Sequence, residues 1–142
     1  MADFATIKAK VVLKVQGVTD KLAAAAVFNH EPPIDSVELD PFAVVIASGN
    51  ENDWVSSNES RRTYAFTVRL FMERKSRGES NAESALTALV DDLLDDFDQD
   101  PYLSSTVLIS RAVPSRWGYV QGTKEYRYAE IIVIAKTDFS IS

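Results

Sequence analysis

The feature that most constrains the fold is a strictly alternating stretch that runs from Arg61 to Glu73. From Tyr64 onwards every second position of this stretch is apolar, and most of the positions between are polar. The apolar set comprises Tyr64, Phe66, Val68, Leu70 and Met72, and the polar set includes Thr63, Thr67, Arg69 and Glu73. Because successive side chains of a strand point to opposite faces, this period of two predicts a β-strand with one buried and one wetter face.

A second periodic stretch follows between Ser80 and Phe97, where apolar residues recur at spacings of three and four. These residues are Ala82, Ala85, Leu86, Leu89, Val90, Leu93, Leu94 and Phe97. The spacing predicts a helix with one broad apolar stripe for packing on a sheet. Ser80 and Glu83 have the spacing of a capping box at its start, and Pro101 prevents its continuation.

A first helix is predicted from Asp3 to Val15, where apolar residues again fall on one stripe. These residues are Phe4, Ile7, Val11 and Val15. An aspartate oxygen can accept from the free backbone N–H groups at a helix start, so Asp3 is the expected cap. Gly17 is the expected stop.

Residues 18–40 give conflicting signals. The run Ala23 to Ala26 favours a helix by propensity, whereas Pro32 and Pro33 force an extended or turning chain. The sequence of this segment is therefore compatible with either a strand or a helical turn, followed in both cases by a loop.

A second strand is predicted from Phe42 to Ser48, which begins just after Pro41 and is rich in β-branched residues. The polar stretch that follows, Gly49 to Ser60, is predicted to be a loop. It contains one aromatic residue, Trp54.

Two more strands are predicted near the carboxyl terminus, from Val107 to Val113 and from Lys124 to Asp138. Residues 117–119 (Trp-Gly-Tyr) and 121–123 (Gln-Gly-Thr) are expected to join them. Within the last strand, Ile131 to Ile134 is continuously apolar, which favours a central strand covered on both faces.

Two strand pairs that flank a helix indicate an α+β fold. We expect an antiparallel or mixed sheet of about four or more strands, with two main helices packed on one face. The length of 142 residues corresponds to one ordinary domain, residues 1–142.

Charge and composition exclude several classes of protein. A net charge of -6 disfavours a protein that coats DNA, although an acidic surface can line a passage through which DNA slides. The chain has no cysteine, which excludes disulfides and thiolate zinc sites. It begins without the features of a signal peptide and has no apolar run near the roughly 18 residues that a membrane span needs. We expect a protein made in a cytoplasm, with no membrane contact.

The sequence lacks the motifs that carry known chemistries. His30 is the single histidine and has no neighbouring motif that would orient it as a base. Asp96 to Asp100 places aspartates at alternate positions, as in a calcium loop, but Pro101 stands where that loop needs glycine and Val107 where it needs glutamate. Phosphate-binding glycine loops and hydrolase motifs are absent. We therefore expect no enzyme activity, no cofactor and no metal.

Aromatic and basic residues near the strand ends are the candidates for a protein interface. Trp and Tyr in loops either fold back onto the core or serve as interface anchors. The candidates are Trp54, Trp117 and Tyr119, together with Arg61, Arg62, Arg74, Lys75 and Arg77, which bracket the alternating strand. The basic residues are either solvated strand ends or partners for acidic groups of a neighbouring subunit.

The acidic positions Asp91, Asp92, Asp95 and Asp96 fall on the face of the second helix opposite the leucines. A solvated helix face explains them. Acids near a helix carboxyl end oppose the helix dipole, however, so they can also serve a lumen or a contact between subunits.

Four stretches carry a resemblance to a known family. They are ATIKAKVVLKVQGV, RRTYAFTVRLFME after a polar loop, ESALTALVDDLLDDFDQD and RWGYVQGTKEYRYAEIIVIAKT. In order and length they resemble the tail terminator and tail-completion (tail-to-head joining) proteins of long-tailed bacteriophages. The closing strand is similar too, since it has an aromatic-rich start at Tyr126 and Tyr128 and an apolar end at Ile131 to Ile134.

The resemblance implies a structural virion protein of the tail or neck that assembles into a homo-hexameric ring. Such a ring caps the tail tube or joins it to the head, so the implied partners are copies of the chain, the tail-tube protein and neck or connector proteins. DNA passes through without sequence-specific binding. No catalytic residue transfers, because the family has none.

Two other readings of the residues stay open. One is a small-ligand-binding α+β module whose sheet and long helix enclose an apolar pocket. The other is a host-interaction or toxin-system domain of similar layout.

Overall fold

The computed structural model describes residues 3–17, 22, 26–33, 37–56, 59–74, 78–121 and 124–140. Of residues 50–56, 59, 60 and 138–140 it describes the backbone only.

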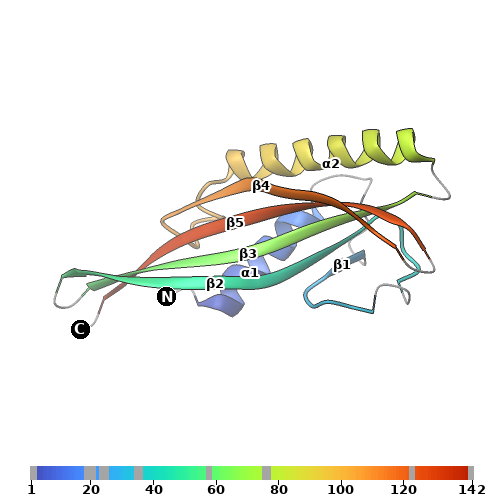
Figure 1. Ribbon diagram of the computed structural model, residues 1–142. Helices are drawn as coiled ribbons and strands as arrows, with labels where there is room; N and C mark the ends of the chain where they lie inside the picture. The colour runs from blue at the N-terminus through green and yellow to red at the C-terminus, as the bar shows by residue number, and fades with distance from the viewer. Residues whose placement is uncertain are drawn as a thin grey trace.

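The chain forms a five-stranded mixed sheet with two helices packed on one face (Figure 1), which confirms the predicted α+β class. The elements are α1 (Phe4–Gln16), β1 (Val27–Phe28), β2 (Phe42–Ser56), β3 (Glu59–Glu73), α2 (Glu79–Gln99), β4 (Ile109–Val120) and β5 (Tyr126–Ser140). The strand order is β1-β2-β3-β5-β4. The short β1 pairs parallel to β2, and all other neighbours are antiparallel.

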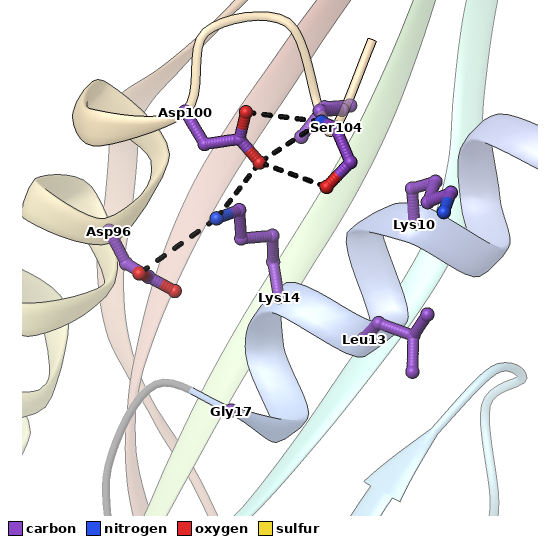
Figure 2. Close-up of a pocket in the computed structure, with 8 residues that line it drawn as sticks. Lys10, Leu13, Lys14, Gly17, Asp96, Asp100 and Ser104 are labelled. Atoms are coloured by element: carbon purple, nitrogen blue, oxygen red, sulfur yellow. Dashed lines mark hydrogen bonds and ion pairs between the residues drawn. The ribbon is translucent and has the colours of Figure 1, made fainter. Parts of the chain in front are cut away.

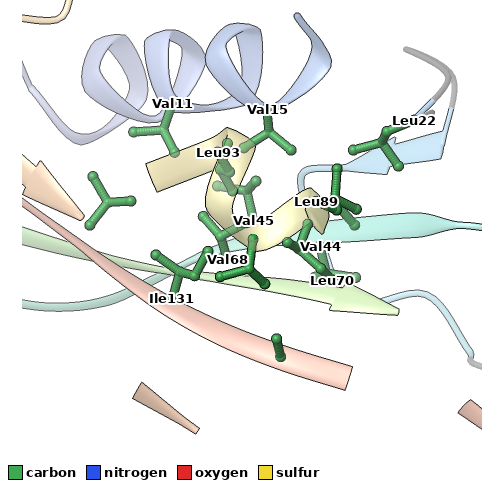
Figure 3. Close-up of a cluster of buried hydrophobic side chains, with 14 of the residues drawn as sticks. Val11, Val15, Leu22, Val44, Val45, Val68, Leu70, Leu89, Leu93 and Ile131 are labelled. Carbon is green, nitrogen blue, oxygen red and sulfur yellow. The ribbon is translucent and has the colours of Figure 1, made fainter. Parts of the chain in front are cut away.

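Both helices bury the stripes that the sequence predicts. On α1, Ile7, Val11 and Val15 are fully buried. On α2, the buried residues are Ala82, Leu86, Leu89, Val90, Leu93 and Phe97. Figure 3 shows the two stripes meeting the same face of the sheet, where β2, β3 and β5 contribute Val45, Val68 and Ile131. The larger part of the hydrophobic core therefore lies between the helices and this face, and Phe42, Phe71 and Tyr126 form a smaller part on the other face.

The helix starts differ in how they are capped. The backbone N–H of Thr6 donates to Asp3 Oδ1 at 2.9 Å, as predicted, and this bond lowers the pKa of Asp3. The predicted capping box of α2 is wrong. Gly78 precedes the helix with φ 83°, a conformation that suits glycine, so Ser80 lies inside the helix and Glu83 is left to bind elsewhere.

The alternating strand β3 is confirmed, and the five apolar residues of the predicted set, Tyr64, Phe66, Val68, Leu70 and Met72, are all buried. The predicted loop from Gly49 to Ser60 is wrong. The β2–β3 ladder continues from Phe42 opposite Phe71 to Ser56 opposite Glu59, so most of this stretch is strand. Pairing with β3 extends β2 there although its sequence is polar.

The paired ends of β2, β3 and β5 form an extension that we call the arm, comprising residues 50–56, 59–63 and 136–140. The Phe4 ring packs edge-on against Tyr64 at 4.5 Å between centroids, which is where α1 begins. Beyond this contact the strands project past both helices (Figure 1). The arm is thus a three-stranded ribbon outside the helix-covered core.

The strand β4 is longer than predicted, whereas β5 has the predicted length and lies two residues further along the chain. Trp117 and Tyr119 lie within β4, because their ladder partners on β5 are Ala129 and Arg127, so the predicted connection at residues 117–119 is wrong. The strand β5 lies between β3 and β4, as expected of a central strand. Its two faces differ, however: Ile131 is fully buried under the helices, whereas Ile132 on the other face is only half-buried.

Within residues 18–40 the structure describes a short strand and an aromatic cluster. Phe28 of β1 packs edge-on against Phe42 at 6.1 Å, and Phe42 stacks on Phe71 at 4.6 Å. The alanines 23–25 lie outside the described residues. No helix in the described part of the chain is long and apolar enough to cross a membrane.

Candidate functional site

Three of the predicted interface residues meet at one end of the sheet. Arg74 follows β3, whereas Trp117 and Tyr119 lie on β4, and β5 adds Arg127. The Tyr119 ring has the guanidinium carbons of Arg74 and Arg127 each 4.6 Å from its centroid. Arg127 also lies 5.4 Å from the Trp117 ring. We call these four residues the aromatic–arginine patch.

Two glutamates of α2 balance the charge of this patch. Arg127 Nε donates to Glu83 Oε2 at 2.7 Å, and its Nη1 donates to the Gly118 carbonyl at 3.1 Å. Arg74 forms an ion pair with Glu79. The Arg127 hydrogen bond lowers the pKa of Glu83, and the same bond raises the pKa of Arg127. The guanidiniums are thus oriented by α2 and stacked on the rings.

Replacing Arg127 tests this arrangement. We expect Arg127→Met to lower the free energy of unfolding by about 1–2 kcal/mol, because the charged hydrogen bonds are lost while the exposed Glu83 stays hydrated. The pKa of Glu83 should rise towards its ordinary 4.5. A carboxyl group whose pKa is lowered in the folded state stabilises the fold at pH values above its unfolded-state pKa. This stabilisation is lost as the pH falls through the folded-state pKa. The free energy of unfolding should therefore decrease less on acidification in the variant than in the natural chain.

Denaturant unfolding and an NMR titration of Glu83 measure both effects. Arg116→Met is the matched control, since Arg116 is an exposed arginine on the neighbouring strand β4. Equal effects of the two substitutions would show that the patch contributes nothing specific.

A glycine between the two patch aromatics allows close packing on the other face of β4. A Cβ added at Gly118 would lie 2.7 Å from the ring of Tyr128, its ladder partner on β5. A side chain here would displace that ring, so Gly118 is required by a close approach and not by a turn.

Exposed apolar side chains concentrate on β4 and the turn before it. In the described ranges, the exposed large apolar residues are Leu13, Leu39, Tyr102, Leu108, Ile109, Trp117 and Tyr119, and five of these seven lie between positions 102 and 119. Trp117 is 39% exposed and Tyr119 58%. The strand β4 is also an edge of the sheet. An edge strand with exposed apolar side chains is typical of a surface that another protein covers.

The turn that leads into β4 has an unusual backbone. Leu103, Ser104 and Ser105 have φ of 45°, 56° and 66°, which is uncommon outside glycine. Asp100 stabilises the turn by accepting from the Ser104 backbone N–H at 3.1 Å, and this bond lowers the pKa of Asp100. The turn thereby directs the chain from α2 to the edge of the sheet.

The predicted acidic residues divide into two groups. Lys14 of α1 binds Asp100 at 3.1 Å and Asp96 at 3.9 Å, beside a hollow of about 320 Å³ between the helices (Figure 2). Asp91, Asp92 and Asp95 are exposed on α2. Asp96 is thus partly neutralised by Lys14 of the same chain. The other three predicted acidic residues remain candidates for a lumen or for contact with a partner.

The remaining interface candidates lie away from the patch. Arg61 and Arg62 are on the arm, opposite Asp53 and Asn52 of β2, and both make interactions within the chain. Trp54 lies opposite Ser60, with its side chain outside the description. Lys75 and Arg77 are outside the described residues. The basic residues that bracket β3 therefore belong to two separate regions.

The sequence reasoning missed Arg127 and Glu83. A signal for Arg127 exists, because it shares alternate positions with the buried Ala129, Ile131 and Val133. A charged residue in such a set needs a partner. Its partner Glu83 could not be identified, because it comes from α2, 44 positions away along the chain.

The described side chains include no group of three or more His, Cys, Asp or Glu placed to hold a metal ion. His30 lies beside Asn29, with Nδ1 3.0 Å from its side-chain oxygen. Comparison with known proteins adds no family: no protein-family model matches the sequence, and no curated protein matches it either.

Proposed function

We propose that this chain is a structural subunit of a long-tailed bacteriophage, a ring-forming tail terminator or tail-completion protein. The observation that carries the proposal is the arm. Its strands continue beyond the contact of Phe4 with Tyr64, where helix coverage ends. A β-ribbon needs a hydrophobic face or a packed helix for independent stability in water, and neither helix extends over these strands. A neighbouring subunit that packs against the arm supplies the missing contacts.

The edge strand β4 supports the same proposal. Its exposed apolar side chains and the aromatic–arginine patch provide the residue types that are enriched at protein interfaces. The arm and β4 lie on different parts of the sheet, so one copy can offer two unlike surfaces to its two neighbours. Unlike surfaces produce head-to-tail contacts, which form a ring when the rotation between neighbours closes and a filament when it does not.

The proposed mechanism is mechanical. Six copies close a ring that stacks on the last ring of the tail tube and either stops its growth or joins it to the neck. The partners are copies of the chain, the tail-tube protein and neck proteins, and the location is the virion. The exposed Asp91, Asp92 and Asp95 suit a lumen through which DNA passes without being trapped.

A small-ligand-binding module is the alternative, and one hollow favours it. Phe42, Val44, Phe71 and Val120 line this hollow, with Arg69 and Glu31 at its polar side. Its volume of about 220 Å³ is below the roughly 300–1,000 Å³ of typical ligand pockets. The ring subunit therefore remains the better-supported function.

Electron microscopy of particles made without this protein tests the proposal. We expect overlong tails, or tails without heads, and restoration of normal virions when the chain is supplied again. Light scattering on the purified protein should show a hexamer or concentration-dependent association. Normal virions together with a strict monomer that binds a small ligand would contradict the ring function and favour the module.

A further inference from the structure

We propose that copies of this chain join by strand pairing, with β2 in the arm of one copy lying antiparallel to the first part of β4 in the next. The inference rests on the proposed ring function and names the contact that closes the ring.

Both strands have an open edge in the described part of the chain. The strand β1 pairs with β2 only at Ala43 and Val44, and no described strand pairs with the outer side of β4. The four long strands alternate in direction, so β4 runs antiparallel to β2. A second copy in the same orientation therefore presents its β2 antiparallel to β4, which is the pairing that continues the sheet.

The ladder defines which residues lie level across one copy. The pairs in succession are Ile109 with Lys136, Lys136 with Thr63, and Thr63 with Glu51. Without stagger, Ile109 thus faces Glu51 of the neighbour. Sheets that close around an axis have tilted strands and a staggered register. A stagger of two residues brings Arg111 opposite Glu51 and Leu108 opposite Trp54.

With this stagger, a basic residue lies opposite an acidic one and an apolar residue lies opposite an aromatic one. Residues 45–56 contain two acids, Glu51 and Asp53, and no basic residue, whereas β4 contains Arg111 and Arg116 and no acid. On the ladder within its own copy, Glu51 is opposite the neutral Thr63. Opposite-charge and aromatic–aliphatic pairs across strands are stabilising.

The apolar pair of this register involves Leu108, which immediately precedes β4. Leu108 is 48% exposed and the adjacent Ile109 is 53% exposed. The proposed register places position 54 of the neighbouring copy, the tryptophan in the polar part of β2, level with Leu108.

The paired segment ends within β4. Pro114 lacks a backbone N–H, and the register of β4 shifts between Pro114 and Arg116. We expect pairing to cover residues 108–113 only. The aromatic–arginine patch lies beyond this break and stays available for a different partner.

The absence of cysteine makes a direct test possible. One copy carries Glu51→Cys and the other Arg111→Cys, and the mixture is oxidised at the highest concentration the protein reaches. Cross-strand neighbours have Cα atoms about 4.5–5.5 Å apart, which a disulfide spans. We expect a mixed disulfide dimer as the main product. The control replaces Glu51→Cys by Ser84→Cys, an exposed position on α2.

Charge reversal is the second test and does not depend on disulfide geometry. Arg111→Glu and Glu51→Arg should each weaken self-association about tenfold or more, because like charges then meet across the strands. Combining both in one chain should restore association. Arg116→Glu makes the same charge change beyond the register break and should have little effect.

Four outcomes decide between the hypotheses. Selective cross-linking together with rescue by the double variant supports the strand pairing. Cross-linking no stronger than in the Ser84→Cys control, or equal effects of Arg111→Glu and Arg116→Glu, overturns it. A hexamer detected by light scattering without formation of the 51–111 disulfide refutes this contact but leaves the ring function standing. A strict monomer combined with normal virions made without the protein refutes both.

Discussion

We expect Leu93→Ala to lower the free energy of unfolding by about 3–5 kcal/mol, the largest effect of any single substitution considered for this chain. Leu93 is fully buried between α2 and the sheet, among the side chains of Val45, Val68 and Ile131 (Figure 3). Truncation removes apolar contacts and leaves a cavity that the packed helices cannot fill. A loss of this size is a large part of the roughly 5–15 kcal/mol that stabilises a typical domain.

Leu13→Ala is the matched control, because it is the same substitution on the other helix. Leu13 is 59% exposed, so its truncation should change the free energy of unfolding by less than about 0.5 kcal/mol. Chemical denaturation followed by circular dichroism measures both values. Similar losses for the two variants would mean that α2 does not cover the sheet as described.

Removal of the β2 and β3 parts of the arm should abolish assembly and leave the core folded. The variant replaces residues 51–63 by Asn-Gly, which suits a two-residue hairpin and joins Asn50 to Tyr64, its ladder partner. The contact of Tyr64 with Phe4 is retained, and so are the buried residues of β3. We expect cooperative unfolding to persist, whereas light scattering should show a monomer at concentrations where the natural chain associates.

A shorter deletion provides the graded control. Joining Asp53 to Arg61 through Asn-Gly keeps Glu51 and removes Trp54, so association should be weakened but not lost. The two variants should also differ in virion assembly, with the long deletion behaving like absence of the protein. Full association of the long deletion would show that the arm plays no part in assembly.

The main elements were predictable because their periodicity reflects burial. In β3 and α2 the apolar positions recur with the period of the element, since each element has one face against the core. The cap at Asp3 was predictable for a similar reason, because it depends on residues three positions apart. Local spacing is sufficient where the deciding contacts are local.

The arm and the candidate site were not predictable in this way. Residues 49–56 are polar and were expected to be a loop, but the pairing of β2 with β3 makes them strand. Trp117 and Tyr119 were expected between strands, and the β5 ladder places them within β4. Strand propensity depends strongly on the neighbouring strand, which the local sequence does not specify.

Sequence patterns alone were sufficient to predict the fold class, the core-facing residues of both helices and the buried face of β3. Only the tertiary structure decided the strand order, the extent of the arm and the meeting of Arg74, Tyr119 and Arg127 with Glu83. The physical reason is the range of the interactions. Hydrophobic periodicity is set by the geometry of one element, whereas edges, extensions and charge clusters arise from contacts between segments far apart in the chain.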